Sequence, residues 1–179
     1  VGQFNYGNRV ASLTWGHGFN ENLYSSLSLN TTNYHYTLQS KMSDSKVKWK
    51  SDITDVTLRW DLDHSVLDIL KLTYGASSTY HNFNPGLITR PDYPDYKMPL
   101  YHALEHGVYL SAEHNLVKNL TVRYGLRLSA FQNMGSITSY SYGTNHEVSD
   151  STYYGSGKVY HTYYALEPRV GMVYKLTDN

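Results

Sequence analysis

Apolar and polar residues alternate with a period of two along most of the chain. In residues 120–131, one face carries Leu120, Val122, Tyr124, Leu126, Leu128 and Ala130, and the other carries Thr121, Arg123, Gly125, Arg127 and Ser129. Helical spacing would mix these two sets, whereas an extended strand separates them. The pattern therefore predicts a strand with one apolar and one polar face.

The same alternation recurs in four other segments, which are residues 55–62, 70–77, 104–113 and 166–176. Two earlier segments, roughly residues 5–16 and 22–37, follow it less regularly. Near Tyr34 and Tyr36 the alternation slips, which we interpret as a β-bulge. Together these segments predict seven strands.

The predicted connections alternate between short and long. The short ones are residues 17–22, 63–68, 114–119 and 177–179, and the long ones are about 39–50, 84–101 and 133–159. The long connections hold four of the five prolines and are rich in Ser, Asp, Asn and Tyr, as loops are. Hairpins of this kind in succession predict an all-β, antiparallel, up-and-down meander.

Alternation suits both a soluble β-sandwich and a membrane barrel, because each has one apolar and one wet face. Twelve residues at ~3.3 Å each span ~40 Å, or ~28 Å when tilted by ~45°, close to the apolar band of an outer-membrane barrel. Short turns at one end and long loops at the other also favour the barrel. Trp15, Trp60 and Tyr174, towards the short turns, are expected in an interfacial aromatic girdle.

Composition excludes several other classes of partner, site and membrane structure. Lys plus Arg equals Asp plus Glu, 15 each, which argues against a nucleic-acid partner. The absence of cysteine excludes disulfides and zinc–thiolate sites. Tyrosine is unusually frequent at 19 residues, and no apolar run approaches the ~20 residues of a membrane helix. If the chain meets a membrane interior, it must therefore do so as a closed barrel.

Motifs for catalysis or metal binding are weak. The stretch His102–His106 spells H-x-x-E-H, but zinc peptidases need that spacing on a helix. On a strand, His102 and His106 share a face and Glu105 points to the other. We find no phosphate loop, no G-x-S-x-G elbow and no other metal motif, so we predict no enzyme activity, no catalytic residue, no metal site and no cofactor.

The binding candidates are aromatic residues in the long connections, because tyrosine offers a large contact area at low entropic cost. They are Tyr93, Tyr96, Tyr101, Tyr140, Tyr142, Tyr153 and Tyr154. Packing within the loops is an equally good reading of these rings. Charged residues on the polar face are expected to hold the barrel wall together, and they are Glu105, Arg123, Arg127, Glu167 and Arg169. Neighbouring strands are expected to bring opposite charges together on this face, with Glu105 and Glu113 beside Arg123 and Arg127.

Three stretches carry a family resemblance. The segment YYALEPRVGMVYKLTDN resembles a strand and turn of TonB-dependent outer-membrane receptors. HGVYLSAEHNLVKNLTVRYGLRLSAFQN resembles the preceding barrel hairpin of that family, and LKLTYGASSTYHNFNPG the hairpin arm before it. The resemblance covers most of residues 50–179, in matching order, and residues 1–40 more loosely.

This resemblance implies a plugged barrel of about 22 strands in the outer membrane of a Gram-negative cell. Such receptors import a scarce nutrient (an iron chelate, haem, cobalamin, a glycan or a peptide) with energy from the TonB complex. Residues 1–179 show no plug, no TonB box and no closing strand, so we expect a partial barrel domain of about seven strands from the middle. Its expected partners are membrane lipids, the remaining barrel and plug, TonB through that plug, and in some systems a surface lipoprotein.

Two other function classes stay open. One is a soluble or surface-anchored β-sandwich that acts as a binding module. The other is a passive porin or an adhesin-type barrel. Detergent dependence separates the sandwich from the barrels, and a plug region in the intact gene separates the receptor from the porin.

Overall fold

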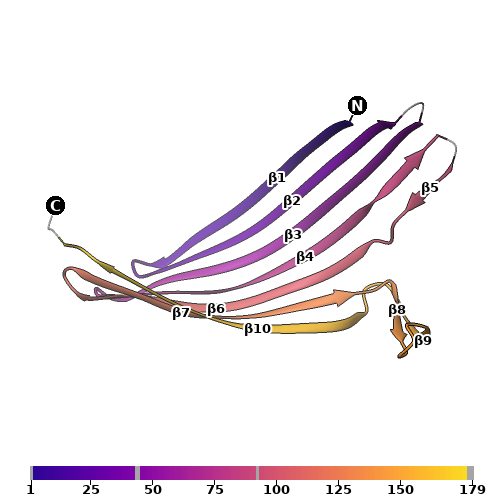
Figure 1. The fold of residues 1–179 in the computed structure, drawn as a ribbon. Coiled ribbons are helices and arrows are strands. Elements are labelled where there is room, and N and C mark those ends of the chain that lie inside the picture. The colour runs from indigo at the N-terminus through magenta and orange to yellow at the C-terminus, as the bar shows by residue number, and fades with distance from the viewer. Residues whose placement is uncertain (1, 43–44, 92, 177–179) are drawn as a thin grey trace.

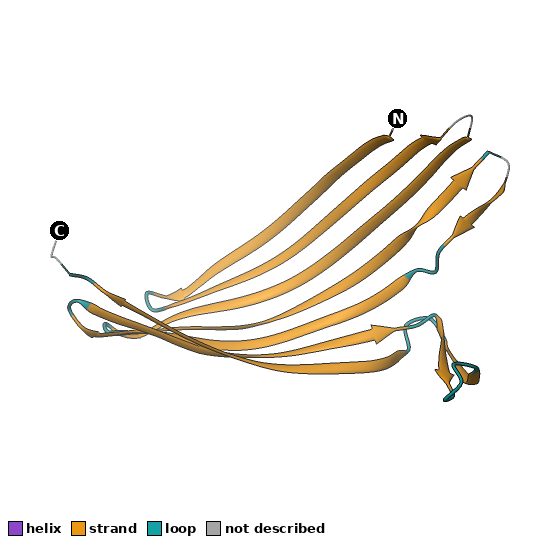
Figure 2. Cartoon of the chain, in the orientation of Figure 1, coloured by secondary structure: helices purple, strands orange, loops and turns teal. Residues whose placement is uncertain are grey.

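The computed structural model describes residues 2–42, 45–91 and 93–176, and it is all-β. Its described part contains ten strands and no helix (Figure 2). The strands are β1 (Gly2–Asn20), β2 (Leu23–Met42), β3 (Ser45–Leu67), β4 (Leu70–Arg90), β5 (Tyr93–Lys97), β6 (Tyr101–Val117), β7 (Leu120–Met134), β8 (Ile137–Tyr142), β9 (Val148–Tyr154) and β10 (Val159–Tyr174).

Seven long strands form one antiparallel sheet in the order β1-β2-β3-β4-β6-β7-β10, which confirms the predicted meander. The short strand β5 pairs with the C-terminal end of β4, at Leu87, Ile88 and Arg90. Strands β8 and β9 form a separate hairpin. Figure 1 shows an open, strongly curved wall. The sheet does not close on itself, since β1 and β10 each pair on one side only among the described residues.

The pairing register keeps the apolar residues of neighbouring strands on one face. One row across the sheet contains Trp15, Leu27, Trp60, Ala76, Val108, Leu128 and Leu166. Directly paired residues in an antiparallel sheet project to the same side. The alternation along single strands thus becomes a continuous apolar face over the short-turn half of the sheet.

No second layer covers this apolar face in the described part of the chain. Leu13, Leu166 and Val170 are 72%, 63% and 82% exposed. Within residues 2–42, 45–91 and 93–176, Ala103 and Ala112 are the only buried hydrophobic residues, and no large side chain is fully buried. This part of the chain therefore lacks a hydrophobic core of its own.

The strands are much longer than the sequence pattern indicates. β2 and β3 run through most of residues 39–50, which we predicted to be a loop, and β4 continues to Arg90. The prediction of a loop over 84–101 was likewise wrong, because Pro85 and Gly86 form an irregularity within β4 rather than its end. The register shifts opposite them, between Lys50 and Asp52, and Gly86 has a φ of 144° that favours glycine.

The predicted bulge near Tyr34 and Tyr36 is also wrong. The β1–β2 register shifts only between Gly18 and Asn20, and the β2–β3 register does not shift at all. The alternation slips there because the aromatic residues change faces, as described below.

Pro168 lies within an unbroken register between β10 and β7, where it pairs with Leu126. The Lys175 amide donates to the Asn119 carbonyl at 2.9 Å, which makes Tyr174 and Leu120 a non-hydrogen-bonded pair. Hydrogen-bonded and non-hydrogen-bonded pairs alternate along the ladder, and Pro168 lies six residues before Tyr174, so Pro168 and Leu126 are also a non-hydrogen-bonded pair. The nitrogen of Pro168 therefore points away from β7, towards the outer edge of β10. Because proline has no amide hydrogen for a ladder, the sequence predicts a local bulge or a missing hydrogen bond at Pro168. That prediction is wrong, since the register is unbroken and the proline nitrogen points away from β7.

Two other expectations concern single elements. The predicted turn at 177–179 lies outside the described residues. No helix long and apolar enough to cross a membrane occurs among the described residues.

Candidate functional surfaces of the sheet

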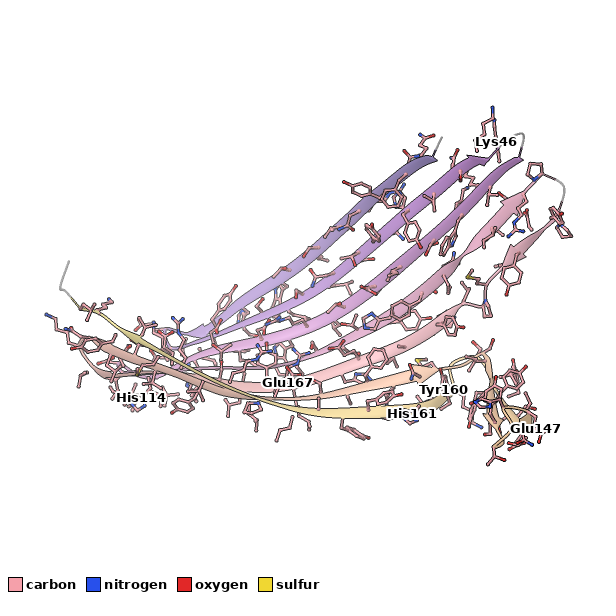
Figure 3. The ribbon with its side chains drawn as sticks, in the orientation of Figure 1. Lys46, His114, Glu147, Tyr160, His161 and Glu167 are labelled. Carbon is pink, nitrogen blue, oxygen red and sulfur yellow. The ribbon has the colours of Figure 1, made fainter. Side chains whose placement is uncertain are left out.

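The charged side chains gather on the concave face of the sheet. A groove of about 910 Å³ follows this face, and its charged lining includes Arg59, Lys71, Glu113 and Arg123. Figure 3 labels Glu167 on β10, on the side towards which the sheet curves. The uncovered apolar face lies on the opposite, convex side.

Cross-strand ion pairs connect β6, β7 and β10 on the concave face. Arg123 Nε lies 2.7 Å from Glu113 Oε2, and Arg127 Nη2 lies 3.2 Å from Glu105 Oε1. Both pairs confirm the charge pairing predicted between these strands. The predicted lumen-facing residues thus form a connected polar network on one face, but no part of the structure tests whether that face lines a lumen.

Glu167 extends this network to β10. It accepts a hydrogen bond of 2.6 Å from Ser129 Oγ and one of 3.2 Å from Arg169 Nη2. Arg127 Nε lies 3.7 Å away from Glu167 Oε1. Each of these ion pairs is partly exposed to solvent, so screening keeps its contribution to stability small.

A second polar group on the same face was not predicted. His81 Nδ1 lies 2.8 Å from Asp55 Oδ1, and its Nε2 lies 3.7 Å from Glu105. The rings of Phe83 and Phe131 flank His81 at 5.6 and 6.0 Å. Sequence reasoning missed this group because it joins side chains from three strands, and only the register brings them together.

Arg59, Asp61 and Tyr109 form a third group. Arg59 donates two hydrogen bonds to Asp61, at 2.7 and 3.0 Å, and one of 3.0 Å to the Tyr109 hydroxyl. The Tyr109 ring in turn lies over Gly75, its partner across β4 and β6. An aromatic ring that covers a glycine in this way supports a curved sheet.

Beyond the apolar band, the polarity of the two faces is exchanged. On the convex face, the apolar band ends at a polar row across five strands, which consists of Arg9, Asn33, Thr54, Asn82 and His102. Past this row, the concave side of β1, β2 and β3 carries aromatic rings, and these are Phe4, Tyr6, Tyr34, Tyr36 and Trp49. We call these five rings the aromatic patch.

The rings of the aromatic patch contact one another in a chain. Phe4 stacks on Tyr6 with ring centroids 5.6 Å apart, and it lies 6.0 Å from Tyr36. Tyr36 also lies 6.5 Å from Tyr34 and 6.0 Å from Trp49. The signal for this patch was present in the sequence as the slip in alternation, which we misread as a bulge.

The predicted binding tyrosines do not form one site. Tyr93 and Tyr96 lie on β5, and Tyr101 begins β6. Tyr140 and Tyr142 lie on β8 and Tyr153 and Tyr154 on β9, so the connection predicted over 133–159 contains a hairpin. All except Tyr154 are exposed, and their role in binding stays a prediction.

Tyr154 is only partly exposed, because its ring contacts the start of β10. Its ring lies 5.3 Å from the ring of Tyr160.

The H-x-x-E-H stretch lies within β6, which confirms the strand predicted there. His102 Nδ1 lies 2.8 Å from the Tyr80 hydroxyl, while Glu105 faces Arg127 on the other side. Among the described residues, no group of three or more His, Cys, Asp or Glu side chains could hold a metal ion.

The predicted girdle aromatics lie on the apolar face. Trp15 and Trp60 share one row with Leu27 between them, and Tyr174 is the last residue of β10. Trp60 Nε1 donates to Ser25 Oγ at 2.8 Å, so the polar atom of this ring is satisfied within the face. Their location at a membrane interface stays a prediction.

Comparisons with known proteins returned no match to a family model, to a curated protein or to a solved structure. The geometry of the two faces is therefore the main guide to function.

Proposed function

We propose that this chain forms part of the wall of an outer-membrane β-barrel that transports a nutrient in a TonB-dependent manner. The carrying observation is the uncovered apolar face on one side of a sheet whose other side is charged and ion-paired. In water this face would expose Leu, Val and Trp side chains across seven strands. Lipid acyl chains cover such a surface without a second protein layer.

The length and stagger of the strands support the same proposal. The apolar band ends at the polar row, while β1, β2 and β3 continue beyond it as regular strands. The last residue of β1, Asn20, aligns through successive pairs with Val170, four residues before the end of β10 at Tyr174. A consistent stagger of this kind accompanies the tilted strands of a barrel.

The transport activity rests on the resemblance of residues 50–179 to TonB-dependent receptors. The remaining strands and a plug would close the barrel and fill its lumen. A β-sandwich would require a second sheet over the apolar face, and the described residues contain none. The charged network of Glu105, Arg127 and Glu167 would then face the plug or the aqueous lumen.

The three tryptophans give a direct test of the lipid-facing surface. Trp15 and Trp60 lie on the apolar face, while Trp49 lies in the aromatic patch. We expect brominated phosphatidylcholine to quench the fluorescence of a Trp49→Phe variant, which keeps the two apolar-face rings. The double variant Trp15→Phe/Trp60→Phe is the matched control and should be quenched much less. Equal quenching of both variants, or none, would contradict the proposal.

Energy coupling is tested separately in cells. We expect uptake through the intact gene product to stop when TonB is deleted. Uptake that persists without TonB would instead support the passive porin.

A further inference from the structure

We infer that the aromatic patch binds a neutral carbohydrate. This inference deepens the proposed function, and it rests on that function in one respect, namely that the concave face is open to water. It narrows the range of nutrients from iron chelates, haem, cobalamin, glycans or peptides to one chemical class.

The exchange of polarity shows that the patch is not a continuation of the apolar convex face. Across the same strands, the convex side now carries Arg9, Asn33 and Thr54. The rings of Phe4 and Tyr6 on the concave side are 55% and 70% exposed. Large rings are thus displayed on the inner side, at the level where the outer side is hydrophilic.

The polar atoms of the patch distinguish between possible occupants. Among the described residues, the hydroxyls of Tyr6, Tyr34 and Tyr36 have no hydrogen-bond partner. A lipid chain or an apolar segment would bury these hydroxyls without a hydrogen-bond partner, which costs free energy for each one. A ligand with apolar ring faces and hydroxyls at its edges satisfies both the rings and the phenols.

Trp49 is positioned to offer its ring face and not its N–H. Its Nε1 already donates to the Pro85 carbonyl at 2.9 Å. Its ring packs against Gly86, where a Cβ atom would collide with it. The indole is therefore fixed before any ligand arrives, which lowers the entropic cost of stacking.

Charge also favours a neutral ligand. The concave side at this level carries Leu38, Ser51, Ile53 and Phe83 besides the patch, and none of these is ionisable. The nearest acidic side chain on this face, Asp55, is paired with His81 at 2.8 Å. Among the described residues, the rows that hold Trp49, Tyr36 and Tyr34 contain no cation that could balance an anionic ligand such as an iron chelate. Arg90 lies on the same side, but in the next row, two residues beyond the Ile88 partner of Trp49.

The test measures the emission of Trp49 in the Trp15→Phe/Trp60→Phe protein, purified in detergent. The probes are neutral hexasaccharides of glucose, mannose and xylose in α and β linkages. Stacking of a sugar on the indole should change its emission with a saturable dependence on concentration for at least one probe. A charged oligosaccharide and a tyrosine-rich peptide serve as competing ligand classes.

Variants locate the binding surface. Tyr36→Ala removes the ring that joins Phe4 to Trp49, and we expect it to weaken binding about tenfold or more. Tyr36→Phe keeps the ring and removes only the hydroxyl, so it should weaken binding less and also shows that the patch is still folded. Tyr164→Ala, which removes an exposed ring from the opposite, convex side of β10, is the matched control and should leave affinity unchanged.

The outcomes separate this inference from the proposed function. If brominated lipid quenches Trp15 and Trp60 but no neutral sugar changes Trp49, the barrel proposal stands and the carbohydrate inference is wrong. Preference for the peptide or the charged sugar, or equal loss of affinity in Tyr36→Ala and Tyr164→Ala, would also overturn it.

Discussion

The Ser25 side chain is one of the few buried polar groups, with 2% of its surface exposed. It lies on the apolar face and accepts the indole N–H of Trp60 at 2.8 Å. We expect Ser25→Ala to lower the free energy of unfolding by about 1–3 kcal/mol, because the indole N–H then has no acceptor in an apolar environment. Denaturant unfolding in micelles, followed by tryptophan fluorescence, measures the change.

Ser26 provides the matched control. It lies one residue further on, on the opposite face, and its hydroxyl has no hydrogen bond among the described residues. Ser26→Ala should change stability by less than about 0.5 kcal/mol. Equal effects of the two substitutions would mean that the Trp60 hydrogen bond contributes nothing specific.

At the scale of the strands, Gly75 marks a close approach between β3 and β4. A Cβ atom there would collide with the Trp60 carbonyl oxygen and lie 2.7 Å from the Tyr109 hydroxyl. We expect Gly75→Ala to destabilise the sheet by about 1–3 kcal/mol, because backbone must move to make room. The loss should appear as a lower midpoint of thermal unfolding in micelles.

Gly171 on β10 is the control for this prediction. It lies on the same concave face, but a Cβ atom there would meet nothing within 4 Å. Gly171→Ala should therefore be close to neutral. A similar loss at both positions would indicate a general intolerance of the strands to alanine and would contradict the steric argument.

The strands also show how far sequence reasoning reaches. Where one face is uniformly apolar, as in Leu120–Ala130, periodicity predicts the strand, its faces and the opposite charges that meet across strands, such as Arg123 and Glu113. The prediction needs only local spacing, because each side chain alternates sides regardless of its neighbours.

Periodicity fails where the environment of a strand changes along its length. In residues 34–38 and 47–49, the apolar residues move to the other face, so a search for one continuous apolar side ends too early. The prolines led to a wrong prediction for a related reason. We took Pro85 as part of a loop, whereas Pro85 and Gly86 form a bulge within β4 and pairing with β3 continues on both sides of it. The aromatic patch and the His81 group depend on register between strands, which no single segment specifies.

At the scale of the whole molecule, the absence of a core in the described part of the chain leads to a prediction about solubility. The apolar face and the outer edges of β1 and β10, which have no partner strand among the described residues, are both expected to drive association in water. In plain buffer we expect large assemblies, and in detergent micelles a single defined species with the circular dichroism of β-sheet. Size-exclusion chromatography with light scattering measures this difference. A folded monomer in plain buffer would exclude the membrane assignment.

The position of Pro168 has a consequence for unwanted growth of the sheet. Its nitrogen faces outwards from β10, so the edge offers a ladder of donors with one missing in the middle. An identical chain that docks along this edge during folding would leave one carbonyl without a donor, at a cost of about 1–3 kcal/mol. That penalty would be repeated at every added copy in a fibril, whereas a barrel that closes once would incur it only once.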